Sequence, residues 1–447
     1  TDRSKVLEAV AERIHRGTSY REVVAALLLA GVRNVQPRPS VGFKFHAVLV
    51  VNSAHLASIS SPDEHRWLPI FWAIDSFKGS QARDVEEGNW TMAPVDESRV
   101  PPSHLAKRAF IEAMDNWDEA AADAAVASLA RNAGANELFD IFAHYGCRDF
   151  RSIGHKAIYV ANAWRTLNCV GRQYSEPVLR SLAYALLNHE GGGNPARSDL
   201  DADRPGRENV ARAKKLRDDW QTGTVDPAAT HDLLATIYGG SSSDLCDQIV
   251  ETINRGVSPQ SVWDAMLVGA GELLMRQPGI VGLHTLTTSN ATRYAFGACG
   301  DDETRKLLLL QNAAFLPLFR GAMTGRGRVG EQKVEELQAA EIPADSVAAL
   351  DSIFADVSGN RLDAARKTLA YARANPQPHD FVNRARTLIF LKGRDAHDYK
   401  FSSAVLEDYE NVSPAWRDKF LATSVFNFKG SGDGDNNLVK RTQAALA

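Results

Sequence analysis

The chain has 447 residues, 44% of them hydrophobic, which is enough for a large core and for two or three domains. Its formal net charge is −4 with acidic and basic residues interspersed, a pattern that lacks the basic footprint of nucleic-acid and membrane-surface binders. No apolar run reaches the roughly 18 to 20 residues of a membrane span, so we expect a soluble protein with no nucleic-acid or membrane partner.

In the first part of the chain, apolar spacing predicts helices over Asp2–Arg16 and Tyr20–Val32, ended by Gly17 and Gly31. Ser19 is the expected N-cap of the second helix. The apolar run around Val48–Val51 also reads as a helix, buried on most sides. Further helices are expected over 69–77, 104–114, 118–131, 136–144, from 155 onward, and 174–189.

The polar stretch Phe77–Pro102 is too long for an ordinary connection. It is either a lid or a surface insertion whose Trp90 is held by packing. Residues 191–225 form the expected linker and seam, with a charged, water-facing helix over Asn209–Trp220. Beyond it, helices are predicted over 231–238, 244–255, 259–275, 281–296, 302–319, 329–340, 345–354, 361–375, 380–391, 396–410 and at the C-terminal end. Period-2 runs are almost absent, so the predicted class is all-α.

An internal duplication relates the two parts of the chain. Six residues from Arg16 to Leu28 recur at one offset of 239 (255 minus 16): Arg16, Gly17, Ser19, Val23, Ala26 and Leu28 match Arg255, Gly256, Ser258, Val262, Ala265 and Leu267. We therefore predict two pseudo-symmetric helical halves, 1–190 and 226–447, packed around a central site.

Each predicted half offers two histidines at similar spacing. His46 and His155 are 109 residues apart (155 minus 46), and His284 and His397 are 113 apart (397 minus 284). A single histidine on an apolar helix is more often a hydrogen-bonded core residue than a ligand. Because the pair recurs, we predict that the four imidazoles share one metal ion. Iron, zinc, copper and nickel all accept imidazole, so the histidines do not choose the metal.

Lys400 lies three residues after His397, one helical turn away on the same face. Burial beside a cation would make this amine neutral, and a neutral amine can take up CO2 to form a carbamate with an anionic oxygen. The first half has Ile158 at the matching place. Asn52, Asn162 and Asn290 recur on the ligand-bearing faces, so we expect them to bind substrate or ligands, or to be packing amides.

The segments around these residues resemble the questin oxidase-like family of non-heme iron oxygenases, which are helical and cleave anthraquinone-type rings. The resemblance lies in the helix of His46, GHKAIY around His155, GLHTLTTSNATRY around His284, and DAHDYK around His397 and Lys400. It implies Fe(II) bound by four histidines and a carboxylated Lys400. Five protein ligands on an octahedral ion leave one position for O2 or a substrate oxygen.

The sequence thus predicts an iron-dependent oxygenase that acts with O2 on an aromatic, quinonoid or similar small organic substrate and cleaves a ring or a C–C bond. Lys400, Asn52 and Asn290 are its predicted catalytic residues. Two alternatives stay open: a zinc-dependent hydrolase with the same His and Lys ligands, and a non-catalytic helical scaffold. Tyr399, Arg293 and Trp90 are weaker pocket candidates.

The remaining histidines and the cysteines add less to the prediction. His55 and His144 are substitute ligands, whereas four more histidines are expected at the surface: His15, His65, His104 and His231. The four cysteines form no CxxC pair, which argues against a thiolate zinc site and a dense disulfide framework. Substrate, oligomeric state and compartment stay open. The sequence is compatible with a cytoplasmic protein and, if a leader precedes Thr1, with an exported one.

Overall fold

The structure is a computed structural model that describes residues 1–38, 42–187 and 193–447, with the backbone alone for 42–45. The described residues contain 21 α-helices and no strand, which confirms the predicted all-α, multi-helical class. Residues 39–41 and 188–192 lie outside the described residues. The helix end expected at His189 and the start of the expected linker at residue 191 fall in the second gap. None of the described helices is long and apolar enough to cross a membrane.

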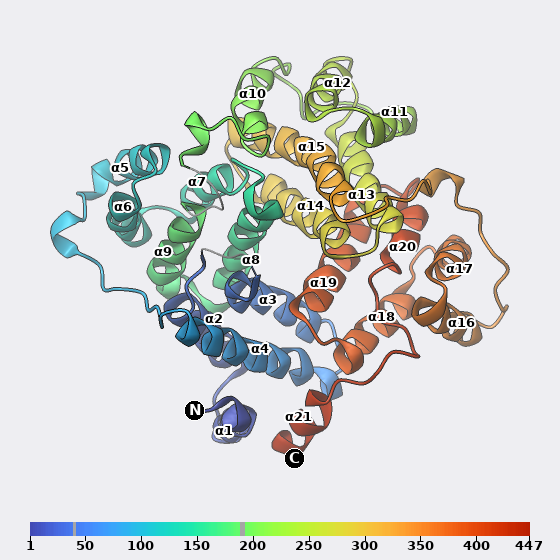
Figure 1. Cartoon of the computed structure of the whole chain (residues 1–447), viewed down its shortest axis with the longest axis horizontal. Helices are drawn as coiled ribbons and strands as arrows, with labels where there is room; N and C mark the ends of the chain where they lie inside the picture. Colours follow the sequence, from blue (N-terminus) through green and yellow to red (C-terminus); the bar gives the residue numbers. More distant parts are fainter. Residues whose placement is uncertain (39–41, 188–192) are drawn as a thin grey trace. The chain divides into compact units, whose positions relative to one another are not determined.

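The chain forms two compact units, of which the first comprises residues 1–204, 297–305 and 437–447. In this unit, α3 packs beside α4 and α8, while α21 packs on α1 and α4 (Figure 1). Its helices are α1 (Val6–His15), α2 (Tyr20–Asn34), α3 (Gly42–Ile59), α4 (Trp67–Glu86), α5 (Ser103–Asn116), α6 (Glu119–Asn132), α7 (Ala135–Gly146), α8 (His155–Val170), α9 (Ser175–Leu186) and α21 (Leu438–Leu446).

The second unit comprises residues 205–296 and 306–436. Here α13 packs on α11 and α20, and α19 packs on α18 and α20. Its helices are α10 (Arg204–Ala213), α11 (Pro227–Gly239), α12 (Ser242–Asn254), α13 (Pro259–Arg276), α14 (Ile280–Ala298), α15 (Asp302–Thr324), α16 (Ser346–Gly359), α17 (Arg361–Ala374), α18 (His379–Lys392), α19 (Ala396–Asn411) and α20 (Arg417–Ser424). The end of α14 and the start of α15 belong to the first unit.

Local sequence explains how α2 and α13 begin. Ser19 caps α2 in a reciprocal capping box with Glu22, and Ser258 caps α13 by accepting the N–H of Gln260. Gly17 and Gly256, two residues before each cap, both have φ near +97°, a conformation that favours glycine. These starts are alike, while the duplication of the whole chain stays a prediction.

Gly31 does not end α2, contrary to the sequence-based prediction, because the helix continues to Asn34. A Cβ at Gly31 would lie 2.9 Å from the carbonyl oxygen of Ala47 in α3. This glycine therefore permits the close approach of α2 to the helix that carries His46. The apolar run of α3 is fully buried, as predicted.

The polar connection predicted over Phe77–Pro102 is present but shorter than expected, since α4 extends to Glu86 and α5 begins at Ser103. The remaining segment is held in place: the N–H of Met92 donates to Arg33, and Arg180 donates to the carbonyl of Ala93. Trp90 lies against Tyr184 with ring centroids 5.4 Å apart. These contacts favour the packing interpretation of this segment over a lid.

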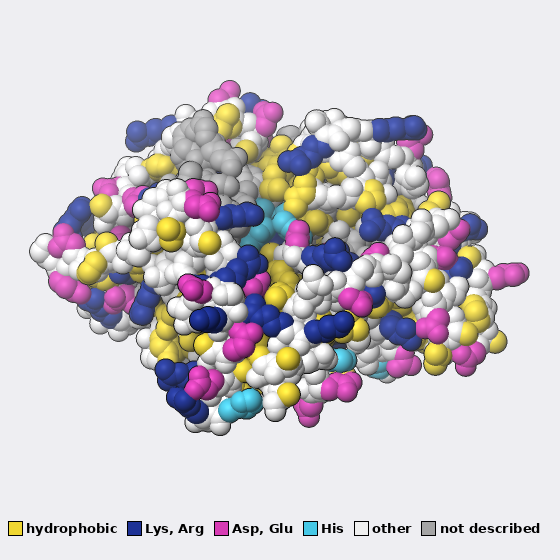
Figure 2. Space-filling view, turned by 60° about the horizontal axis from the view of Figure 1, so that its bottom comes forward, with side chains coloured by type: hydrophobic (Ala, Val, Ile, Leu, Met, Phe, Trp, Pro, Cys, Tyr) yellow, Lys and Arg dark blue, Asp and Glu magenta, His cyan; other side chains and the backbone are white. Residues whose placement is uncertain are grey.

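Two other helix predictions were wrong. A water-facing helix was expected over Asn209–Trp220, but the helix there ends at Ala213. Both Asn209 and Trp220 are fully buried. Residues 329–340 contain only the short 3-10 turn Val334–Glu336. One helix that was not predicted, α20, buries Phe420 and Leu421. On the face drawn in Figure 2, basic and acidic side chains are interspersed and neither sign dominates.

Candidate metal centre

The first unit brings together His46 of α3 and His155 of α8. Their ring centroids lie 5.6 Å apart. Both side chains are buried, with exposed fractions of 7% for His46 and 2% for His155. Because α3 and α8 pack directly on each other, residues 109 positions apart in the chain become neighbours.

A tight turn before α8 fixes the orientation of His155. Ser152, Ile153 and Gly154 have φ values of +60°, +46° and +77°, so three successive residues are left-handed. This conformation is unfavourable for serine and isoleucine. It presents the carbonyl oxygen of Ser152 to Nδ1 of His155 at 2.7 Å.

Buried ion pairs hold this turn from both sides. Lys156 donates to both carboxylate oxygens of Asp149, at 2.9 and 3.0 Å. Arg151 forms a two-pronged ion pair with Asp203. All four side chains are almost completely buried. Removing one partner of such a pair leaves an uncompensated charge, so these contacts make the turn hard to rearrange.

The second unit brings together His284 of α14 and His397 of α19, whose ring centroids lie 5.1 Å apart. His284 is fully buried, and its Nδ1 lies 2.6 Å from the carbonyl oxygen of Ile280, one turn earlier. Asp395 is the N-cap of α19 and accepts hydrogen bonds from the backbone N–H and from Nδ1 of His397. The side chain of His397 is 17% exposed.

These contacts assign the proton of three imidazoles. A carbonyl oxygen only accepts hydrogen bonds, so Nδ1 of His155 and of His284 must carry the proton. The carboxylate of Asp395 requires the same of His397. In a neutral ring Nε2 then keeps its lone pair, and a donor bond from the other nitrogen to a carbonyl or carboxylate is typical of metal-binding histidines.

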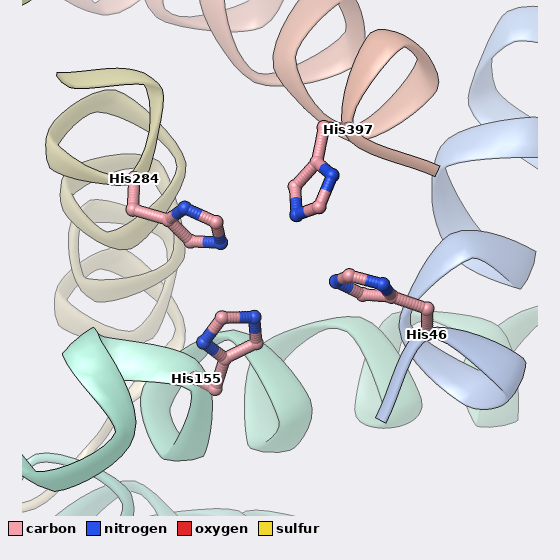
Figure 3. Close-up of side chains that lie close together, drawn as sticks. All are labelled: His46, His155, His284 and His397. Carbon is pink, nitrogen blue, oxygen red and sulfur yellow. The ribbon is translucent and has the colours of Figure 1, made fainter. Parts of the chain in front are cut away.

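The four histidines form one cluster. The nitrogen atoms of His46, His155, His284 and His397 that could bind a metal lie within 4.8 Å of one another. Figure 3 shows the four rings directed toward one another from α3, α8, α14 and α19. It is the one group of three or more potential ligands found among the described residues. Four neutral imidazoles fit a transition-metal ion, so the cluster is compatible with metal binding.

Asp395 and His397 have shifted proton affinities. Burial lowers the pKa of His397, although its hydrogen bond to Asp395 opposes this shift. Burial raises the pKa of Asp395, but the hydrogen bonds and charge of His397 outweigh it, so the net shift is downward. The pair therefore favours a neutral imidazole beside an ionised carboxylate, which is the state needed for a metal ligand.

Lys400 lies on α19 one turn after His397 and is 2% exposed. Burial lowers its pKa to about 7, against the opposing charge of Asp395. A substantial fraction of this amine is therefore neutral at neutral pH. Ile158, at the matching place in the first unit, is also buried but has no titratable group.

The three asparagines bridge helices within their own units. Asn162 donates to the carbonyl of Leu49 at 3.0 Å and receives a long contact of 3.5 Å from Asn52. Asn290 donates to Glu407 of α19 at 2.7 Å. These contacts are those of packing amides, and the catalytic roles predicted for Asn52 and Asn290 stay predictions. The Oδ1 atom of Asn52 is buried without a hydrogen-bond partner.

The other candidate residues have contacts or surroundings of their own. His55 pairs with Tyr20 at 2.9 Å, and His144 lines a separate cavity of the first unit. Tyr399 is fully buried, and Arg293 lies over the ring of Trp263. Sequence reasoning missed the carbonyls of Ser152 and Ile280 and the carboxylate of Asp395. For Asp395 a signal existed, because Asp two residues before a histidine at a helix start is a typical cap.

Comparison of the chain with protein families, with curated proteins and with solved structures found no match.

Proposed function

We propose that the protein is a non-heme iron-dependent oxygenase, in which both histidine pairs bind one Fe(II) ion. The observation that carries the proposal is the cluster of four imidazoles, three of them with Nδ1–H bound to an oxygen acceptor. A buried histidine whose only task is packing has no need to direct a ring nitrogen toward three other imidazoles. This arrangement also argues against the non-catalytic scaffold.

We propose Lys400, in the form of a carbamate, as the fifth ligand of the ion. Its neutral amine attacks CO2, a N–C bond forms, and one proton leaves, so that the side chain ends in a carbamate with an anionic oxygen. Burial favours this reaction because it lowers the pKa of the amine to about 7. The carbamate would neutralise one of the two charges of the ion in a buried site, where unpaired charge is costly.

Bound Fe(II) supplies the redox chemistry by which O2 oxidises an electron-rich organic molecule. The chain itself favours the neutral state of His397 and keeps most of the surface of the four rings away from water. We propose an aromatic or quinonoid substrate whose ring or C–C bond is cleaved. This substrate class rests on the resemblance of the four histidine segments to questin oxidase-like enzymes.

Metal analysis of the purified chain tests the proposal. Protein prepared without oxygen should contain about one iron per chain, and O2 uptake with a polyhydroxylated anthraquinone should require that iron. His284→Ala should abolish metal retention while circular dichroism keeps its helical signal. His231→Ala, at an exposed histidine paired with Glu335, is the matched control and should retain the metal.

The alternatives give different results in the same experiment. Preferential retention of zinc, with ester or amide hydrolysis in place of O2 uptake, would support the hydrolase. If the chain binds neither Fe(II) nor Zn(II) after reconstitution, the result would support the non-catalytic helical scaffold.

A further inference from the structure

The first unit contains a second concave site, built from residues that the metal centre does not use. It is a cavity of about 460 Å³ formed by α5, α7 and the start of α15. Pockets for small organic molecules have volumes of this order. The cavity thus has room for a molecule of several heavy atoms in addition to water.

The lining of this cavity carries an excess of negative charge. Four carboxylates face a single cation, Lys107, and that cation is paired with Glu137 at 3.0 Å. Within the part of the chain that the structure describes, no lysine or arginine forms a salt bridge with the remaining three. They are Asp115, Asp140 and Asp301.

The donors that do reach these three carboxylates are neutral. Asp115 accepts the hydroxyl of Tyr145 at 2.9 Å, while Asp140 and Asp301 accept the backbone N–H groups of Gly300 and Thr304, both at 2.8 Å. Such bonds orient the carboxylates without cancelling their charge. The buried guanidinium of Arg148, which does not line the cavity, acts on Asp115 through its charge, so Asp140 and Asp301 are the less compensated pair. Each aspartate has a second oxygen, so the cavity can accept further hydrogen bonds from a cation.

Uncharged polar groups also face the cavity. Thr304 is only 5% exposed, yet no described residue forms a hydrogen bond with its hydroxyl. The hydroxyl oxygen lies at the cavity surface rather than sealed in the core, so a ligand or water can bind it there. Burial and the charge of Arg148 lower the pKa of His144, so its ring is neutral at pH 7 and offers a nitrogen as acceptor. Ile111, Ile141 and Tyr145 add apolar surface.

We propose that this cavity binds a small organic cation, namely a primary or secondary ammonium group on an apolar body. The ammonium would lie among Asp115, Asp140 and Asp301, and the apolar body would pack on Ile141 and the ring of Tyr145. A bare metal ion fits poorly, because these carboxylates do not form a group close enough to hold one ion. The negative lining repels anions.

Isothermal titration of the whole 447-residue chain, loaded with metal, tests this site with 2-phenylethylamine as the probe. The matched probes are 2-phenylethanol, which lacks the charge, and 3-phenylpropionate, which reverses it. We expect saturable one-to-one binding of the amine, at least tenfold tighter than that of either matched probe, and weakening as salt is raised. Equal affinities for the amine and the alcohol, or no saturable binding of the amine, would overturn the proposal.

Asp140→Asn keeps the size of the side chain and an oxygen acceptor for Gly300 but removes the charge, and it should weaken amine binding at least tenfold. Glu251→Gln makes the same change of net charge on the exposed face of α12 and should leave binding unchanged. If Asp140→Asn does not fold, Asp301→Asn takes its place, since asparagine also caps helices. Unchanged binding by the folded variant would refute the site. None of these three substitutions changes a residue of the histidine cluster, so iron content should stay constant.

Discussion

One carboxylate oxygen of Asp395 accepts two hydrogen bonds from His397, one from the backbone N–H at 2.6 Å and one from Nδ1 at 2.8 Å. The same side chain therefore starts α19 and sets the direction of an imidazole. It couples the stability of a helix to the geometry of the histidine cluster.

Replacing Asp395 by alanine should separate these two roles. Loss of the cap destabilises the protein by about 1 kcal/mol, and loss of the partner of Nδ1 should weaken metal binding 10- to 100-fold. Metal affinity is measured by competition with a chelator, and stability by urea denaturation of the metal-free chain.

Asp345→Ala is the control for this experiment. Asp345 caps α16 by accepting the N–H of Ala348 at 2.8 Å, and no histidine depends on it. It should show the same loss of stability with full metal affinity. Equal metal affinities for the two variants would contradict the role given to Asp395.

The left-handed turn before His155 predicts a substitution that weakens metal binding with little effect on stability. Ser152→Gly relieves an unfavourable φ, worth about 1 kcal/mol, and the lost hydroxyl has no hydrogen-bond partner. The greater freedom of glycine in the unfolded chain offsets much of this gain. Stability should stay within about 1 kcal/mol of the parent, whereas metal affinity should fall about tenfold because the Ser152 carbonyl is less firmly held.

Asn89 provides the comparison, because it too is left-handed, with φ of +54°, and lies exposed after the end of α4. Asn89→Gly should change stability by no more than about 1 kcal/mol and should leave metal affinity unchanged. A Ser152→Gly variant that binds metal as well as the Asn89→Gly variant would show that the turn does not position His155.

Lys400 should make the stability of the metal-free chain depend on alkaline pH. Its folded-state pKa is about 7 and its ordinary value is 10.5, so between these values the unfolded chain binds the extra proton and the folded chain does not. The free energy of unfolding should therefore rise with pH from about 7 toward 10.5. One pKa unit corresponds to about 1.4 kcal/mol.

Lys400→Met removes this dependence and should stabilise the metal-free chain at pH 7 by a few kcal/mol, while the gain shrinks as pH rises. Urea denaturation at pH 7, 8 and 9 measures the effect. Exposed Lys214→Met should leave the pH profile of the parent unchanged. Parallel profiles for the parent and the Lys400 variant would exclude a depressed pKa.

The histidine cluster could be predicted because a pair of histidines recurs in the sequence at nearly the same spacing. His46 with His155 and His284 with His397 have nearly the same spacing, and Lys400 follows its histidine by one helical turn. The predicted closeness of the four rings is confirmed. The ion they bind, its fifth ligand and the reaction stay predictions, since imidazole serves several metals.

Other features depend on tertiary contacts that local sequence does not reveal. The second half of α4 reads as a polar loop because Ser80 and Asp84 are hydrophilic, yet both are buried, and Asp84 accepts the N–H of Gln36. The turn at Ser152 has no sequence signal besides Gly154, because serine and isoleucine rarely adopt left-handed φ. Such a conformation is imposed by its surroundings, here the ion pairs of Asp149 and Arg151.

The docking of α21 has a consequence for how the chain is made. Arg441 of this helix binds Glu8, 433 residues earlier, and donates to the carbonyl of Ser4. The first unit therefore gains its final helix only after the second has been synthesised. Until α21 has been synthesised, the surfaces of α1 and α4 that it covers are exposed. The growing polypeptide should therefore depend on chaperones at that stage and be most vulnerable to proteases at those two helices.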